Sequence, residues 1–308
     1  MDHALARRTA LLLFAAVVLS WGLNWTVTKV IVHSVFPLWA TAMRSAIGAA
    51  VLLVLLLARG QFILPRRGDL AVICSIALLH MVAFSALTAF GLRLVPVGRS
   101  IVLGYTTPLW VVPGAWLFLH EPMTRSRLAG IGLGLAGLMV LFNPLSVDWS
   151  DRNTLVGSGL ILLAALCWAA NILYVRAHTW ISTPFQLAFW QTLLASVVLA
   201  TLALIVDGVP HVEWTDQLVA CFLYAGIFGI ALAYWAMAMV NRSLPATTTS
   251  LGILATPVVG VACSTLALGE TVDASLVIAM VMILSGIALG TIPMTKSADA
   301  IVPAAVRP

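Results

Sequence analysis

Charge is scarce in this chain of 308 residues. Only 9% of the residues are Asp, Glu, Lys or Arg, whereas 62% are hydrophobic and the mean hydropathy is +1.07. In a soluble domain about a quarter of the residues are charged, so this composition excludes an ordinary soluble globular protein. The chain is expected to lie in a lipid bilayer, and its length is better counted in membrane spans.

Carboxylates are absent from the middle of the predicted spans. All eleven Asp and Glu residues fall in predicted loops, tails or span ends. Multidrug antiporters for cationic compounds commonly need a membrane carboxylate, which pairs with the cation and exchanges it for a proton. A zwitterion is easier to accommodate, because its carboxylate can accept from Asn, His or a broken helix end and its ammonium can contact carbonyl oxygens or an indole. If the protein binds a small molecule within the membrane, the absence of carboxylates therefore favours neutral amino acids over cationic drugs as its ligands.

The sequence also lacks the elements of catalysis and of ATP use. Four cysteines lie inside predicted spans without paired spacing and are interpreted as packing residues; they are Cys74, Cys167, Cys221 and Cys263. No convergent nucleophile and base, metal cluster or Walker motif is present in the sequence. We therefore predict no catalytic residue, no metal, no cofactor, no enzymatic activity and no direct drive by ATP.

Long hydrophobic runs dominate the sequence instead. Runs of about 20 residues, enough to cross a hydrocarbon core of about 30 Å, occur ten times. They lie at 9–32, 37–58, 70–92, 97–119, 128–145, 155–175, 183–206, 218–240, 246–268 and 274–293. The connections between them are short. The predicted fold is an all-α integral membrane protein with ten transmembrane helices.

Basic residues are distributed unevenly over the connections. With the N-terminus inside, eleven lie in cytoplasmic segments, whereas three, Arg93, Arg99 and Arg152, lie outside. Lys and Arg prefer the cytoplasmic side, so we expect both termini in the cytoplasm and a multi-pass protein of the cell inner membrane. The net charge of +5 then reflects membrane sidedness rather than nucleic-acid binding.

The second half of the sequence repeats the first. One offset, 149 (257 − 108), relates six residue pairs: Arg93 and Arg242, Pro96 and Pro245, Thr107 and Thr256, Pro108 and Pro257, Glu121 and Glu270, and Gly137 and Gly286. Nearer the start of each half the offset is 147 (168 − 21), as for Trp21 and Trp168. Five spans per half is an odd number, so the halves have opposite orientations. We expect inverted five-helix repeats at 1–145 and 146–295 around a central cavity, then a cytoplasmic tail at 296–308.

Prolines and glycines mark bends and close packing. Pro108 and Pro113 in the fourth span and Pro257 in the ninth each remove a helical hydrogen bond. They are either static kinks or, as we favour, hinges that border a cavity. Small residues four apart let helix backbones approach closely, and they occur in spans five and ten, at Gly130, Gly132, Gly134 and Gly137 and at Gly286 and Gly290. Packing between the halves is favoured over a homodimer face, so the protein is either a monomer or a homodimer.

Several motifs together resemble a known family. They are Trp21-Gly22-Leu23-Asn24-Trp25, Pro37 through Arg44, Thr107-Pro108 through His120-Glu121-Pro122, and Thr256-Pro257 through Gly269-Glu270. The pattern resembles the EamA-type transporters of the drug/metabolite transporter superfamily across both halves, and within it the bacterial exporters of aromatic amino acids. The resemblance implies ten helices in an inverted-repeat basket and a central cavity lined mainly by spans one, three, four, six, eight and nine. One departure is Trp168-Ala169-Ala170-Asn171, which does not match the glycine of the first motif.

The two Trp-x-x-Asn pairs are the leading candidates for a substrate site. Residues i and i+3 share one helix face, which places Trp21 beside Asn24 and Trp168 beside Asn171. The pairs lie a little past the midplane from opposite sides, so we expect them to face each other. An indole and an amide suit a flat apolar substrate with a polar head. The alternative is that each Asn bonds a neighbouring helix and each Trp packs.

Other polar groups in the predicted spans are few. His80, in the middle of the third span, is either a satisfied core donor or a contact for substrate or protons. Arg44 lies inside the second span, where a cation is costly unless it pairs or meets water; we favour a structural or gating tie over direct carboxylate binding. Weaker cavity candidates, chosen as polar or amphipathic residues in spans that the family assigns to the cavity, are Tyr105, Thr106, Tyr174, Tyr234 and Trp235.

The sequence therefore predicts a secondary transporter that exports small neutral metabolites, aromatic and hydrophobic amino acids first, by alternating access. The alternatives are a multidrug or other metabolite exporter of the same superfamily, nucleosides included, and, less favoured, a membrane-embedded enzyme. Its expected partners are a small-molecule substrate and the lipid bilayer, with no nucleic acid. Since only His80 could titrate near neutral pH within a span, uncoupled export down the substrate gradient is expected.

Overall fold

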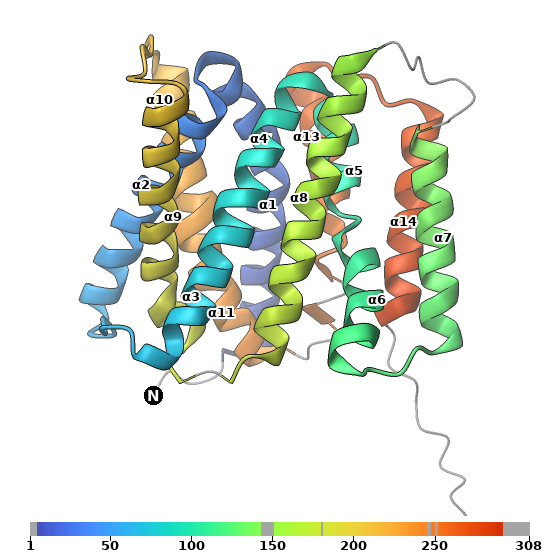
Figure 1. The fold of residues 1–308 in the computed structure, drawn as a ribbon, viewed down its shortest axis with the longest axis horizontal. Coiled ribbons are helices and arrows are strands. Elements are labelled where there is room, and N and C mark those ends of the chain that lie inside the picture. Colours follow the sequence, from blue (N-terminus) through green and yellow to red (C-terminus); the bar gives the residue numbers. More distant parts are fainter. Residues whose placement is uncertain (1–4, 143–150, 180, 245–247, 250–251, 292–308) are drawn as a thin grey trace, which may run out of the picture.

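The chain forms a bundle of helices that run side by side through one body (Figure 1). A computed structural model describes residues 5–142, 151–179, 181–244, 248–249 and 252–291, and these residues form helices and connections but no strand. The helices without internal interruption are α1 (Arg7–Ser34), α2 (Pro37–Ala58), α7 (Arg125–Phe142), α8 (Arg152–Ala177), α9 (Pro184–Val206) and α14 (Ala274–Thr291).

The remaining helices are built from shorter pieces. The first set comprises η1 (Arg67–Asp69), α3 (Leu70–Ser75), η2 (Ile76–Phe84), α4 (Ser85–Leu94), α5 (Val97–Gly104) and α6 (Thr107–Leu119). The second comprises α10 (Asp216–Gly226), η3 (Ile227–Leu232), α11 (Ala233–Ser243) and α13 (Ala255–Leu268). Interruptions therefore occur in both halves of the chain, and they concentrate around the cavity described below.

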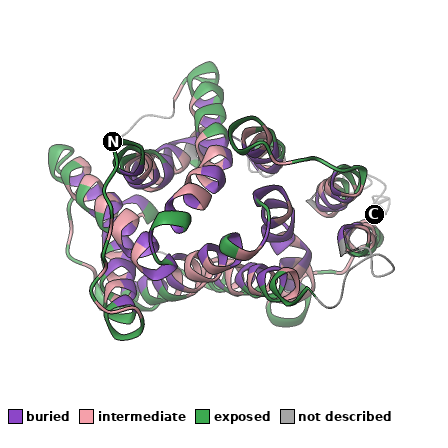
Figure 2. Ribbon diagram, turned by 90° about the horizontal axis from the view of Figure 1, so that it is seen from above, coloured by how far each residue is buried: buried purple, intermediate pink, exposed green. Residues whose placement is uncertain are grey.

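Helix length and surface composition suit a bilayer. Among the described residues, seven helical segments are long and apolar enough to cross a membrane, and Ala255–Leu268 and Ala274–Gly290 are shorter apolar helices. Exposed positions lie on the outer surfaces and the ends of the helices (Figure 2). Many are large and apolar: Leu266 is 87% exposed and Ile205 is 75% exposed. Such side chains would be unfavourable in water but contact lipid tails in a membrane.

Two composite helices pass through a π-helical stretch. η2 joins α3 to α4, and η3 joins α10 to α11. A π-helical turn accommodates an extra residue, so it changes which side chains share a face, and such turns are frequent at functional sites. Both stretches contribute side chains to the cavity.

The prolines lie where the fourth and ninth apolar segments change structure. α5 ends at Gly104 and α6 begins at Thr107, with Pro108 in the first turn of α6, where its missing N–H costs little. The Thr107 hydroxyl donates to the Gly104 carbonyl at 2.8 Å. This carbonyl would otherwise lack a helical partner, because Pro108 has no N–H to donate. Pro113 lies inside α6, and Pro257 lies in the first turn of α13.

Glycines let α7 and α14 pack in direct backbone contact. A Cβ placed on Gly130 would lie 2.4 Å from the carbonyl oxygen of Gly286, and a Cβ on Gly286 would lie 2.4 Å from that of Gly130. Only glycine allows this approach at either position. These two glycines are therefore occupied by packing within the chain, and the pair of helices forms one edge of the bundle (Figure 1).

Candidate functional site

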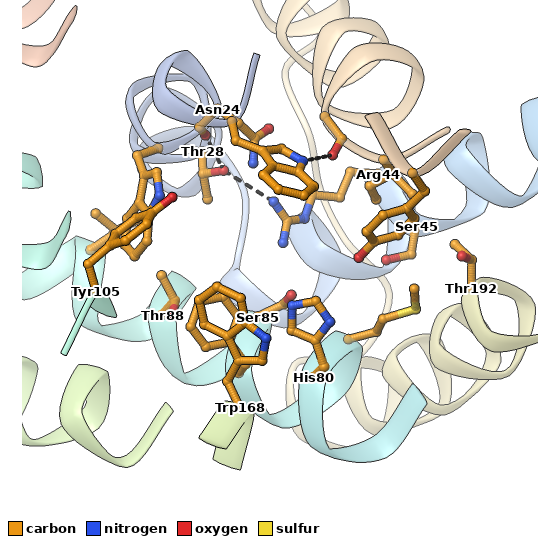
Figure 3. Close-up of a pocket in the computed structure, with 18 residues that line it drawn as sticks. Asn24, Thr28, Arg44, Ser45, His80, Ser85, Thr88, Tyr105, Trp168 and Thr192 are labelled. Carbon is orange, nitrogen blue, oxygen red and sulfur yellow. Dashed lines mark hydrogen bonds between the residues drawn. The ribbon is translucent and has the colours of Figure 1, made fainter. Parts of the chain in front are cut away.

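A cavity of about 150 Å³ lies among the helices (Figure 3). Most of its wall comes from α1, α2, η2, α4 and η3, and single residues come from the α5–α6 connection, α8, α9 and α11. The described residues of the wall are aromatic rings, neutral polar residues, three aliphatic or methionine side chains with one glycine, and an arginine. The residues are Trp21, Trp25, His80, Phe84, Tyr105, Trp168 and Tyr234; Asn24, Thr28, Ser45, Ser85, Thr88 and Thr192; Met81, Leu92, Gly229 and Ile230; and Arg44.

An aromatic cluster forms one side of the cavity. His80 of η2 stacks on Trp168 of α8, with ring centroids 5.2 Å apart and planes 10° from parallel. Phe84 lies 5.0 Å from Trp168 and 5.6 Å from His80, and Trp25 meets Phe84 edge to face at 6.4 Å. Trp168 and His80 keep part of their surface open to the cavity. This side therefore offers flat apolar area to a ligand.

The Trp21 side of the cavity is fixed against the second π-helical stretch. The Trp21 indole N–H donates to the Gly229 carbonyl at 3.3 Å, and the Ser20 hydroxyl donates to the Phe228 carbonyl at 2.9 Å. Successive side chains of α1 thus bind successive carbonyls of η3. Because the indole N–H is used in this way, Trp21 presents mainly ring surface to the cavity.

Asn24 contributes an unused acceptor. Its Oδ1 is buried and accepts no hydrogen bond from any described residue. A Cβ on Gly229 would lie only 2.6 Å from this oxygen, so glycine is what leaves room for the amide. Buried polar atoms are nearly always satisfied in folded proteins, so an acceptor without a partner in a residue that lines the cavity is unusual.

Arg44 brings a positive charge into the cavity from α2. Its Nη1 donates to the Thr28 hydroxyl at 3.2 Å, and that hydroxyl donates in turn to the Asn24 carbonyl at 2.7 Å. The Nε atom is buried and has no hydrogen-bond partner among the described residues. None of the described residues that line the cavity is Asp or Glu. The site can therefore bind an aromatic group and a hydrogen-bonding or anionic group at the same time.

Four residues that the sequence suggested for the cavity lie elsewhere. Asn171 is 5% exposed and accepts from the Ser75 hydroxyl at 3.1 Å. Thr106 is fully buried and accepts from the Trp110 indole at 3.2 Å. Tyr174 lies beside His178 at 6.1 Å between ring centroids, and Trp235 lies under the Arg59 guanidinium at 4.8 Å. The other six, and Arg44, line the cavity.

Sequence reasoning missed more than half of the wall. Trp25 and Thr28 lie four and seven residues after Trp21, spacings that a helical repeat from Trp21 could have found. Ser85 and Thr88 follow a π-helical stretch, where such extrapolation fails. Ser45 and Thr192 lie on α2 and α9, which the expected lining did not include. No sequence signal marked these two residues.

Charged side chains connect helix ends at both ends of the bundle. At one end the Lys29 ammonium donates to the carbonyls of Leu92 and Val95, the latter at 3.0 Å. There the Glu270 carboxylate accepts from the N–H groups of Val97, at 2.7 Å, and Gly98, at 3.0 Å. A carboxylate at the start of α5 and an ammonium near the end of α4 both complement the helix dipoles.

At the other end of the bundle, Glu121 takes part in two ion pairs. It forms an ion pair with Arg127 at 3.0 Å and a second with Arg176. These contacts connect α7 and α8 to the segment that follows α6. Ion pairs that are partly open to solvent contribute little to stability on average, so these pairs matter mainly for the elements that they connect.

Comparisons with known proteins agree over most of the chain. The EamA-like transporter family matches residues 8–143 and again residues 155–292. A solved crystal structure shares the fold with a TM-score of 0.65, over 93% of this chain and 98% of that chain, at 22% identity. At this level of identity the likeness concerns the fold alone.

Similar proteins carry the names of transporters. The uncharacterized transporter YoaV of Bacillus subtilis (strain 168) is 25% identical over 281 residues, which cover 91% of this chain and 96% of that protein. The probable amino-acid metabolite efflux pump of Salmonella typhimurium is 27% identical over 284 residues, 88% of this chain and 91% of the pump. The riboflavin transporter of Rhizobium johnstonii is 32% identical over 148 residues, 47% of this chain and 45% of that transporter.

Proposed function

Because the chain belongs to the EamA-like transporter family and is a multi-pass membrane protein, we propose that it exports small metabolites across the bacterial inner membrane by alternating access. Aromatic and hydrophobic amino acids are the proposed first substrates. The observation that carries this proposal is the aromatic cluster of His80, Phe84 and Trp168, which borders the same cavity as Asn24 and Arg44. The name of the Salmonella efflux pump lends support from a relative.

The chemistry of the wall matches an amino acid better than a cationic drug. Rings supply area for an aromatic or branched side chain. Hydroxyls from Ser45, Ser85 and Thr88 and the amide of Asn24 can contact the polar head, and the guanidinium of Arg44 repels a cation. A permanently cationic ligand would find no carboxylate in the described part of the cavity wall. The wall therefore supports a substrate without net positive charge.

The proposed transport cycle rests on an inverted repeat of ten spans, with halves at 1–145 and 146–295 and both termini in the cytoplasm. The seven long apolar segments, the two shorter ones and α7 would make up the ten. Two structural parallels support the repeat: the third segment of each half contains a π-helical stretch, and α7 packs against its repeat partner α14. Alternating access then corresponds to motion of one half against the other around the cavity.

A larger flat metabolite is the second candidate substrate. The stacked pair of His80 and Trp168 is suited to any planar heterocycle. One relative, which matches over about half of its length, is named as a riboflavin transporter. Such a substrate would contact the same rings but would not need an amino acid head group. Comparing the transport of amino acids with that of riboflavin therefore distinguishes the two candidates.

Uptake into proteoliposomes tests the proposed function. Purified protein is reconstituted, and saturable flux is measured for tryptophan, phenylalanine, tyrosine, leucine, aspartate, lysine and riboflavin. Faster saturable flux of the aromatic and hydrophobic amino acids is expected. Absence of saturable flux for every compound would remove the proposal, and chemical conversion of a compound would favour an enzyme. Protein-free liposomes provide the background.

A further inference from the structure

The described residues of the cavity wall include a positive charge, Arg44, without an ion-pair partner among the described residues. Of the described residues that line the cavity, Arg44 alone is permanently charged. Both ion pairs in the described part of the chain use Glu121, which is not part of the wall. A charge away from water normally pairs with an opposite charge, because desolvation without a partner is costly. Some other group must therefore complete the environment of Arg44 when the cavity closes around a ligand.

The guanidinium is held on one side and available on the other. Its contact with the Thr28 hydroxyl at 3.2 Å uses one N–H, and the hydroxyl can accept because its own proton goes to the Asn24 carbonyl. A guanidinium has several N–H donors in a planar fork that matches a carboxylate. The Nε atom is buried without a partner in the described part of the chain. The geometry therefore orients Arg44 and leaves donors unused.

The guanidinium end of Arg44 points into a cavity with an aromatic wall. In Figure 3 the Arg44 side chain extends from one wall into the ring of lining residues, and His80 and Trp168 lie on the opposite wall. A molecule that stacks its ring on this aromatic pair can direct a short polar arm toward Arg44. Such a molecule needs both a ring and a polar arm, so the arrangement favours molecules with both features over molecules with either one alone.

We infer that Arg44 binds the carboxylate of the transported molecule, so that the substrate class is aromatic carboxylates, of which aromatic amino acids are one case. The inference rests on the proposed function, because it assigns a role within the same transport cavity. An aromatic carboxylate anion neutralises the charge of Arg44 completely. A zwitterionic amino acid adds an ammonium, for which the described residues of the wall offer hydroxyl groups and ring faces but no carboxylate. The amino group is thus tolerated and not required.

Matched ligands separate this inference from the proposed function. Binding of 3-phenylpropanoate, its neutral amide 3-phenylpropanamide, and L-phenylalanine is measured by titration calorimetry on the purified full-length protein. The acid should bind about tenfold or more tightly than the amide, as expected for a charged hydrogen-bonded pair, and at least as tightly as phenylalanine. Equal affinities for acid and amide would overturn the inference and leave the transport proposal standing. Failure of all aromatic compounds to bind or to be transported would overturn both.

Variants of Arg44 test whether the arginine itself makes the distinction. Arg44→Gln should weaken the acid about tenfold or more, to the level of the amide, and leave the amide unchanged. Arg44→Lys keeps the charge without the fork and should retain part of the preference, which also covers the case in which Arg44→Gln does not fold. Arg152→Gln, at an exposed position on α8, is the matched control and should keep the full preference. Equal weakening of acid and amide in both Arg44 variants would assign Arg44 to a structural tie and overturn the inference.

Discussion

The imidazole of His80 and the indole of Trp168 lie nearly parallel, with 5.2 Å between their centroids. The two residues come from η2 and α8, so the stack joins segments that are distant in the sequence. Phe84 completes the cluster at 5.0 Å from Trp168. Ring surface that remains open on these residues is what an aromatic substrate would cover, and the stack fixes its position relative to the polar groups of α1 and α2.

Replacing Trp168 with Ala should weaken transport of aromatic amino acids more than it weakens folding. Loss of one aromatic contact is expected to lower affinity about two- to tenfold, measured as a rise in KM in proteoliposomes. Trp116→Ala is the control, because Trp116 lies on α6, outside the cavity wall, and is 52% exposed. Unchanged kinetics in both Trp21→Ala and Trp168→Ala would assign these two residues to packing alone.

Transport should run down the substrate gradient without a proton gradient. No described residue that lines the cavity is a carboxylate, and His80 already takes part in the aromatic cluster. Flux is measured in proteoliposomes with and without an imposed pH difference, in the wild type and in His80→Ala. We expect no accumulation against a substrate gradient in either protein. Proton-driven accumulation that disappears in His80→Ala would instead identify His80 as a coupling group.

Gly229→Ala should impair transport because the added methyl group collides with Asn24. The new Cβ would lie 2.6 Å from Asn24 Oδ1, so the amide must leave its position or η3 must shift away from α1. Overpacking of this kind costs about 1–3 kcal/mol, seen as a lower thermal unfolding temperature, and KM should rise as well. Gly159→Ala on α8 is the control, since nothing lies within 4 Å of its added Cβ. Normal kinetics in Gly229→Ala would show that the position of the Asn24 amide is irrelevant.

Gly130→Ala should destabilise the protein without changing substrate preference. Its Cβ would meet the Gly286 carbonyl oxygen at 2.4 Å, and a backbone atom cannot yield unless α7 and α14 separate. A loss of about 1–3 kcal/mol is expected. Gly132→Ala on the same helix is the control, because nothing lies within 4 Å of its added Cβ. It measures by itself the gain of about 1 kcal/mol in helix propensity that replacing glycine with alanine brings. Equal stability of the two variants would contradict direct packing of these helices.

Whether the sequence predicts which residues line the cavity differs from helix to helix. α1 is an uninterrupted α-helix, so a spacing of three residues places Trp21 and Asn24 on one face, and both line the cavity. The same motif on α8 separates, because Asn171 meets Ser75 of α3 while Trp168 meets His80. Only the packing of α8 between its neighbours decides which face each residue presents, and the sequence of α8 alone does not contain that information.

Arg44 shows a second limit. A cation inside a span signals a special environment, but its partner depends on tertiary contacts. The sequence favoured a structural tie, and the structure does connect Arg44 to Thr28, yet it also places the guanidinium in the cavity wall. The two roles are compatible, because one N–H anchors the side chain and others remain for a ligand. Likewise, the π-helical stretches η2 and η3 have no simple sequence signature, although they determine which residues after them line the cavity.

The charged contacts at the two ends of the bundle differ from each other. Lys29 and Arg176 are related by the offset of 147 (176 − 29), and Glu121 and Glu270 by the offset of 149 (270 − 121). Arg176 pairs with Glu121, whereas the described contacts of Lys29 and Glu270 are with backbone groups around the α4–α5 connection. Under the proposed inverted repeat, the two related residues form a direct ion pair at one end, whereas at the other end Lys29 and Glu270 interact electrostatically but each contacts backbone groups. Exchange of the two arrangements would produce the opposite conformation of the protein, with Lys29 on Glu270 and Arg176 released.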